Sequence, residues 1–139
     1  VAESITGGWV GQRLTSVSGS GEAFLGGVIT YDLGVKENLL GVEASMLDEF
    51  GPVSEQTATA MAENVREKLK STYGISLTGN AGPSADVDGK PVGLVYIGLA
   101  GPTGVEVREH RLRGNREDIR QRCTQLALVQ LREVLLLNE

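Results

Sequence analysis

A serine close to two glycines near the start of the chain is the first candidate for chemistry. Ser4 precedes Thr6, Gly7 and Gly8, and the apolar positions that follow them have helical spacing. At a turn between a strand and a helix, a serine hydroxyl can stand exposed beside backbone N–H groups that converge on an anion. Such a turn supplies a nucleophile together with oxyanion donors. The alternative is that Ser4 or Thr6 only caps the helix.

Tyr31 and Lys36 are the side chains that could activate this serine. Both follow an apolar segment, and we expect them at the carboxyl end of a strand, where α/β sheets form ligand crevices. A lysine acts as a base only where burial or a neighbouring positive charge lowers its pKa. Otherwise Lys36 is a solvated lysine and Tyr31 a half-buried strand residue. The only histidine, His110, stands at a polar position of an alternating segment, so a serine-histidine-aspartate triad has no candidate.

Arg116 and a glycine-rich loop are candidates for ligand binding. Arg116 falls in the first turn of an expected helix, where the partial positive charge favours acidic side chains over arginine. A guanidinium beside a helix N-terminus binds phosphate or carboxylate well, although an exposed arginine without a role is the alternative. The loop from Thr78 to Pro83 contains Gly79 and Gly82, which allow close approach of the backbone to a ligand, although such loops are usually only turns.

The composition excludes several classes of protein. With 139 residues, 40% of them hydrophobic and 22% charged, the sequence fits one folded domain spanning residues 1–139. Its formal net charge of −5 argues against a nucleic-acid binder but permits a small anionic ligand. No apolar run approaches the roughly 20 residues of a membrane span. With a lone cysteine, Cys123, and no metal-ligand set, we expect a cytoplasmic protein without membrane contact, metal or cofactor.

Alternating helices and strands predict a three-layer α/β/α sandwich with a mixed sheet. The expected strands are the segment ending near Glu3, a buried strand at 24–31, and the segments 75–79, 92–100 and 105–112. The expected helices are one starting near Trp9, one at 35–40, one capped by Ser54, and a last one capped by Asn115 with Asp118 as its capping-box partner.

The two ends of the chain suggest its context. Because the first residue is Val1 and the chain opens on a strand end, we expect a part of a longer protein. The apolar residues from Val134 to Leu137 close the last expected helix. They predict a buried contact between copies, and hence a homo-oligomer of two or more chains.

Six segments, in this order along the chain, resemble the CinA C-terminal family. They are Ala2 to Gly8 (the family's AES-C-TGG signature), Gly19-Ser20 with 24–28, Thr30-Tyr31 with Lys36, Thr78 to Pro83 (TG-x-AGP), Lys90 to Gly93 (KPVG), and Gly114 to Arg116 (G-[DN]-R). Stand-alone members of this family are nicotinamide mononucleotide deamidases. The resemblance therefore implies an amidohydrolase that converts nicotinamide mononucleotide to nicotinate mononucleotide and ammonia, without a metal or cofactor.

The resemblance also implies roles for individual residues. Ser4 corresponds to the nucleophile, with Lys36, directly or through Tyr31, as the base that receives its proton. Arg116 either keeps Lys36 neutral by repulsion or holds an anionic part of the substrate. The expected substrate-binding residues are Thr6, Gly7, Gly8, Ser20, Thr78, Gly79, Gly82 and Arg116.

Two departures from the family pattern stand at the expected site. Ile5 replaces the usual cysteine, so a thiol at that position is not the nucleophile. The segment 84–89 replaces a run of glycines, and its acidic residues would weaken the binding of a phosphate. Two other functions remain open: an interaction domain of a competence/damage-inducible protein without catalysis, and a serine-lysine amidase with another substrate.

Overall fold

The sheet at the centre of the molecule is mixed. The computed structural model describes residues 1–139 and contains five strands in the order β2-β1-β3-β4-β5. The strands are β1 (Ala2–Glu3), β2 (Val28–Ile29), β3 (Gly74–Gly79), β4 (Leu94–Gly101) and β5 (Gly104–Arg111). β1 pairs in parallel with β2 and β3, whereas β4 and β5 join as an antiparallel pair.

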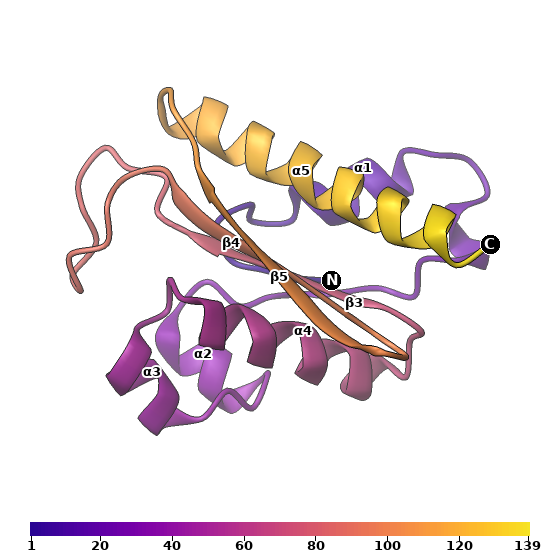
Figure 1. Ribbon diagram of the computed structural model, residues 1–139, viewed down its shortest axis with the longest axis horizontal. Helices are drawn as coiled ribbons and strands as arrows, with labels where there is room; N and C mark the ends of the chain where they lie inside the picture. Colours follow the sequence, from indigo (N-terminus) through magenta and orange to yellow (C-terminus); the bar gives the residue numbers. More distant parts are fainter.

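Helices cover both faces of this sheet (Figure 1). They are α1 (Trp9–Thr15), the short 3-10 helix η1 (Ser20–Glu22), α2 (Leu33–Asn38), α3 (Ala44–Phe50), α4 (Glu55–Leu69) and α5 (Arg116–Leu137). α1 and α5 lie on one face, and α2, α3 and α4 on the other (Figure 1). The expected α/β/α sandwich with a mixed sheet is confirmed. No helix combines the length and the apolar character required to cross a membrane.

Each face of the sheet has its own apolar core. Alternation along β3 turns Ile75 and Leu77 toward the core beneath α1 and α5, which also contains Ile119. Ser76, between them, faces α4 and donates its hydroxyl hydrogen bond to the Ala58 carbonyl at 2.6 Å. A separate cluster that includes Met61 fills the space around α2, α3 and α4.

The structure corrects the expected buried strand at 24–31. Only Val28 and Ile29 form a strand, and Leu25 and Ile29 are 62% and 55% exposed. The reason is that β2 is an edge strand whose only neighbour, β1, has just two residues to pair with it. The helix α3 was not expected from the sequence. The apolar residues Leu135, Leu136 and Leu137 are exposed on α5, so the homo-oligomer stays a prediction.

The capping boundaries of the two long helices are confirmed. Ser54 Oγ accepts a hydrogen bond from Thr57 N–H at the start of α4. Asn115 and Asp118 form a reciprocal capping box at the start of α5. The latter cap fixes the residue at which α5 begins, and so places Arg116 in its first turn.

Gly98 allows α4 to lie close against the sheet. A Cβ on Gly98 would stand 2.7 Å from the Ala58 carbonyl oxygen and 2.6 Å from Ser76 Oγ. We expect Gly98→Ala to lower the free energy of unfolding by about 1–3 kcal/mol, since α4 must move outward. Gly21→Ala is the control, because its added Cβ meets nothing within 4 Å and should change stability by less than about 0.5 kcal/mol. Denaturant unfolding measures both, and equal stabilities would contradict the close packing described.

Candidate active site

Three parallel strands deliver the candidate residues to one edge of the sheet. In the register, Glu3 of β1 stands between Ile29 of β2 and Leu77 of β3. Because parallel strands end at the same edge, the segments that follow them, starting at Ser4, at residue 30 and at residue 80, emerge side by side. α2 follows β2 almost immediately, so Lys36 is carried back toward Ser4.

Ser4 and Lys36 are in direct contact. Lys36 Nζ donates a hydrogen bond to Ser4 Oγ at 3.0 Å. The same amine donates to the backbone carbonyl oxygens of Thr30 at 2.6 Å and Tyr31 at 3.0 Å. Lys36 is 1% exposed and Ser4 is 7% exposed. The amine is therefore enclosed by one hydroxyl and two carbonyl groups.

Burial changes the protonation of this amine. Loss of solvent around Lys36 lowers the pKa of its amine to about 8, while the negative charges of Asp32 and Asp86 act in the opposite direction. The charge of Arg116 is not among the causes that lower this pKa. Burial of Lys36 therefore favours the neutral amine, which was one of the two roles expected for Arg116. A neutral amine has two N–H donors and one lone pair. Two carbonyls and the Ser4 hydroxyl match that set, which suits Lys36 to accept a proton from Ser4.

Tyr31 takes a different position from Lys36. Its side chain is 61% exposed, and its hydroxyl oxygen accepts a hydrogen bond from Arg116 Nη2 at 3.2 Å. The second guanidinium nitrogen of Arg116 donates to the Gly82 carbonyl at 2.6 Å. Lys36 contacts only the backbone of Tyr31. Of the two candidate bases, the structure therefore places Lys36 next to Ser4 and Tyr31 at the rim with Arg116.

A cavity of about 530 Å³ opens in front of Ser4. Its wall contains six of the residues expected from the sequence, namely Ser4, Tyr31, Lys36, Thr78, Gly79 and Arg116. Five other expected contact residues do not line it, namely Thr6, Gly7, Gly8, Ser20 and Gly82.

The positions of those five have local causes. The Thr6 hydroxyl is buried and donates to Glu3 Oε1 at 2.6 Å, while Gly7 N–H donates to the Ser4 carbonyl at 3.2 Å. Gly8 is the residue before α1, and its α-carbon faces the Ile29 side chain. Ser20 belongs to η1, beyond the end of α1. Neither Ser4 nor Thr6 caps α1 with its side chain, which removes that alternative.

Gly82 reaches the cavity only indirectly. Its backbone takes a φ of +78°, in the region that favours glycine, and its carbonyl holds the Arg116 guanidinium. The glycine-rich loop thus positions Arg116 at the rim of the cavity instead of contacting a ligand at this residue.

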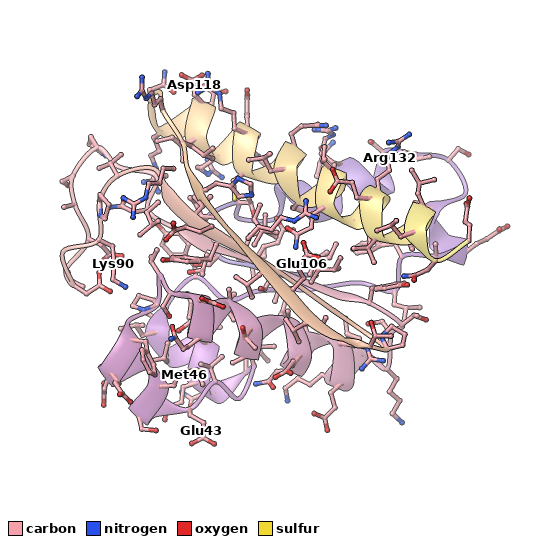
Figure 2. All side chains as sticks on the ribbon, in the orientation of Figure 1. Glu43, Met46, Lys90, Glu106, Asp118 and Arg132 are labelled. Carbon is pink, nitrogen blue, oxygen red and sulfur yellow. The ribbon has the colours of Figure 1, made fainter.

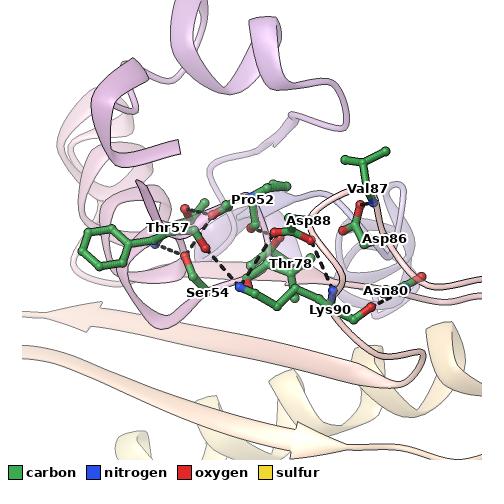
Figure 3. A network of polar contacts seen from close by, with 12 residues as sticks. Pro52, Ser54, Thr57, Thr78, Asn80, Asp86, Val87, Asp88 and Lys90 are labelled. Carbon is green, nitrogen blue, oxygen red and sulfur yellow. Dashed lines mark hydrogen bonds and ion pairs between the residues drawn. The ribbon is translucent and has the colours of Figure 1, made fainter. Parts of the chain in front are cut away.

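A polar network fixes the part of the cavity wall formed by the link between α3 and α4 (Figure 3). Lys90 Nζ donates to the carbonyl oxygens of Phe50 at 3.0 Å and Val53 at 2.6 Å. Thr78 Oγ1 donates to the Pro52 carbonyl at 2.6 Å. These bonds tie the loop after β3 to the link between α3 and α4. Both Pro52 and Val53 line the cavity, so the network fixes the backbone of this part of its wall.

Several wall residues were not singled out from the sequence. Asp32 lies between Tyr31 and Lys36, and its side chain caps α2 by accepting from Gly34 N–H at 2.9 Å. An aspartate between two candidate residues was the available signal. Asp86 comes from the non-glycine loop, whose acidic residues were expected only to weaken phosphate binding, and Val53 comes from the link between two helices. For Val53, no sequence pattern indicates the cavity.

Comparisons with known proteins agree on one family. Residues 1–135 match the family model described as CinA C-terminal domain. The chain is 54% identical over 142 aligned residues to a CinA-like protein of Acaryochloris marina, with all of this chain and 34% of that protein covered. A CinA-like protein of Gloeothece citriformis is 55% identical, with 99% of this chain and 34% of that protein covered. The chain thus spans about a third of the length of these curated relatives.

Solved structures show the same fold. The competence/damage inducible protein CihA of Agrobacterium tumefaciens has a TM-score of 0.90 and 35% identity, covering 99% of this chain and 83% of that one. The competence damage-inducible protein A (ComA) of Klebsiella pneumoniae has a TM-score of 0.93 and 28% identity, covering 96% and 83%.

The charge of Asp86 can be tested directly on Lys36. Because the Asp86 carboxylate stabilises the ammonium form, we expect Asp86→Asn to move the pKa of Lys36 below about 8. An NMR titration of the Lys36 side chain, labelled with 13C at Cε, measures the shift. Asp48→Asn is the control, since Asp48 on α3 is not among the charges acting on Lys36. An unchanged or higher pKa in Asp86→Asn would contradict this role.

Proposed function

Because the chain belongs to the CinA C-terminal domain family, we propose that it hydrolyses the carboxamide of nicotinamide mononucleotide, giving nicotinate mononucleotide and ammonia. The observation that carries the proposal is the contact of 3.0 Å between the Ser4 hydroxyl oxygen and the buried amine of Lys36. A serine beside a lysine of lowered pKa is one arrangement that supports nucleophilic attack on an amide.

The first half of the reaction forms an acyl-enzyme. Neutral Lys36 takes the proton of Ser4 Oγ as that oxygen bonds to the carboxamide carbon, and the C=O electron pair moves to the carboxamide oxygen. When this pair returns, the C–N bond breaks, and the leaving nitrogen takes the proton from Lys36 and departs as ammonia. Backbone N–H groups of the turn after Ser4 stabilise the oxyanion.

The second half releases the acid. Water gives a proton to Lys36 and bonds to the acyl carbon, and collapse of the second tetrahedral intermediate breaks the bond to Ser4 Oγ. The Lys36 proton returns to that oxygen, so both residues regain their starting states. The sum is nicotinamide mononucleotide plus water giving nicotinate mononucleotide plus ammonia.

The charges around the cavity support a ligand of mixed charge. A volume of about 530 Å³ suits a mononucleotide, since small-molecule sites typically span about 300–1,000 Å³. Arg116 at the rim offers its guanidinium to the phosphate. Asp32 and Asp86 suit the positively charged pyridinium ring. The acidic loop residue expected to weaken phosphate binding thus acts on the ring instead.

A second function is favoured by one observation. The chain spans about a third of its curated relatives, which suits a domain that acts within a longer protein as an interaction module. Ammonia release by the isolated chain distinguishes deamidation from this second function, because an interaction module without catalytic activity releases no ammonia. Competition among nicotinamide mononucleotide, nicotinamide and simple amides identifies the substrate class.

The base is tested by changing Lys36 while keeping its charge. We expect Lys36→Arg to be nearly as inactive as Lys36→Ala and Ser4→Ala, each losing at least about a hundredfold in kcat, because arginine keeps its proton. Ammonia release from nicotinamide mononucleotide measures this, with Ser16→Ala as a control at an exposed serine of the α1 end. An active arginine variant would make Lys36 an electrostatic residue and leave Tyr31 as the base.

The anion-binding role of Arg116 predicts a change in KM. Its guanidinium stands at the rim and does not lower the pKa of Lys36, so we expect Arg116→Ala to raise KM about tenfold with little change in kcat. This corresponds to about 1.4 kcal/mol of binding free energy. Thermal stability should hold, because the side chain sits at a helix N-terminus that disfavours it. A lower kcat with normal KM would instead place Arg116 beside the reacting atoms.

A further inference from the structure

The turn that follows Ser4 is held by two charged side chains outside the cavity. From beneath, the Glu3 carboxylate, 2% exposed, accepts hydrogen bonds from the Thr6 hydroxyl at 2.6 Å, Val10 N–H at 2.9 Å and Gly11 N–H at 3.0 Å. From α5, Arg120 approaches the same turn. Neither Glu3 nor Arg120 lines the cavity, and neither was singled out from the sequence.

Arg120 donates hydrogen bonds to two consecutive carbonyl groups. Its Nε donates to the Ile5 carbonyl at 3.0 Å, and its Nη2 reaches the Thr6 carbonyl at 3.4 Å. The guanidinium carbon lies 4.1 Å from the centre of the Trp9 ring, within the range of a cation–π contact. The arginine is thereby fixed on both sides, by the ring and by the turn.

These two hydrogen bonds determine where the N–H groups of the turn point. In a planar trans peptide, the C=O of one residue and the N–H of the next point in opposite directions. With the Ile5 and Thr6 carbonyls turned to Arg120, the N–H groups of Thr6 and Gly7 face away from it. Gly7 N–H donates on that side to the Ser4 carbonyl at 3.2 Å, which turns Ile5 N–H, across the Ser4–Ile5 peptide bond, the opposite way. Ile5 N–H has no acceptor within the chain, and Ile5 lines the cavity next to Ser4.

We propose that Arg120 is a positioning residue for the amidase reaction, holding the turn so that the free Ile5 N–H faces the reacting carbonyl in front of Ser4. This inference rests on the proposed function. When Ser4 Oγ bonds to the carboxamide carbon and the C=O electron pair moves to oxygen, Ile5 N–H donates to that oxygen. Arg120 itself touches neither substrate nor serine.

A structural role alone would give a different result from a positioning role. The oxyanion exists only in the transition state and intermediates, so a misplaced Ile5 N–H lowers kcat and leaves KM nearly unchanged. Loss of packing by itself lowers the melting temperature without that split. A lysine at position 120 keeps the positive charge but is a point donor that cannot span two carbonyls.

The experiment compares Arg120→Lys and Arg120→Met with Arg132→Met. Arg132 is exposed toward the other end of α5 and its side chain makes no hydrogen bond within the chain, so it is a matched control (Figure 2). Steady-state deamidation of nicotinamide mononucleotide gives kcat and KM. Pyridine-3-boronic acid gives a second readout: boron bonds to Ser4 Oγ, the serine proton passes to Lys36, and the tetrahedral boronate carries the negative charge. Nicotinate mononucleotide binding measures the intact cavity.

We expect both Arg120 variants to lose at least about tenfold in kcat and in boronic acid affinity, with KM and nicotinate mononucleotide affinity within about twofold of the unmodified chain. Arg132→Met should match the unmodified chain. Unchanged kcat and boronic acid affinity in the Arg120 variants would overturn the inference. If neither Arg120 variant folds, Trp9→Leu tests the same position of Arg120, because it removes the ring beside the guanidinium. An unchanged kcat in Trp9→Leu would overturn the inference.

Failure of the proposed function gives a separate pattern. If the unmodified chain releases no ammonia but binds the boronic acid, the boronic acid affinities still decide the role of Arg120. If the unmodified chain deamidates its substrate but does not bind the boronic acid through Ser4, the assignment of Ile5 N–H as oxyanion donor is overturned.

Discussion

A buried amine without a carboxylate in contact is the constraint on which the site depends. Lys36 is enclosed by the Ser4 hydroxyl and two backbone carbonyls, and burial brings the pKa of its amine to about 8. A paired carboxylate would hold the proton on the lysine, and open solvent would do the same. Asp32 and Asp86 act on it from the cavity wall without a direct hydrogen bond, which leaves the amine able to exchange its proton near neutral pH.

The rest of the cavity is arranged around that amine by distant parts of the chain. The link between α3 and α4 reaches the wall because Lys90 and Thr78 bond to its carbonyls. α5 contributes Arg116 at the rim and Arg120 behind the turn. Each of these contacts ends on a backbone carbonyl. Lys90 and Arg120 therefore shape the cavity by fixing backbone without lining it, whereas Arg116 does both.

The features that could be predicted were those with local chemical signals. Helix caps at Ser54 and Asn115 were found because short-range hydrogen bonding determines them. The pairing of Ser4 with Lys36 was implied only by the resemblance to the CinA C-terminal family, because each residue taken alone had an ordinary structural alternative. The length of β2 was overestimated, because it is limited by the two residues of its neighbour β1 and not set by the apolar residues of β2 itself. Arg120 gave no signal, since its partners are carbonyls more than a hundred residues away in the chain.

The position of β1 ties the nucleophile to the folding of the whole sheet. This strand of two residues lies between β2 and β3, and its register pairs Ala2 with Val28 and with Ser76. Ser4 therefore comes to lie beside the segment that carries Lys36 through the pairing of β1 with β2. Forms of the chain in which β1 is unpaired would lack the contact between Ser4 and Lys36.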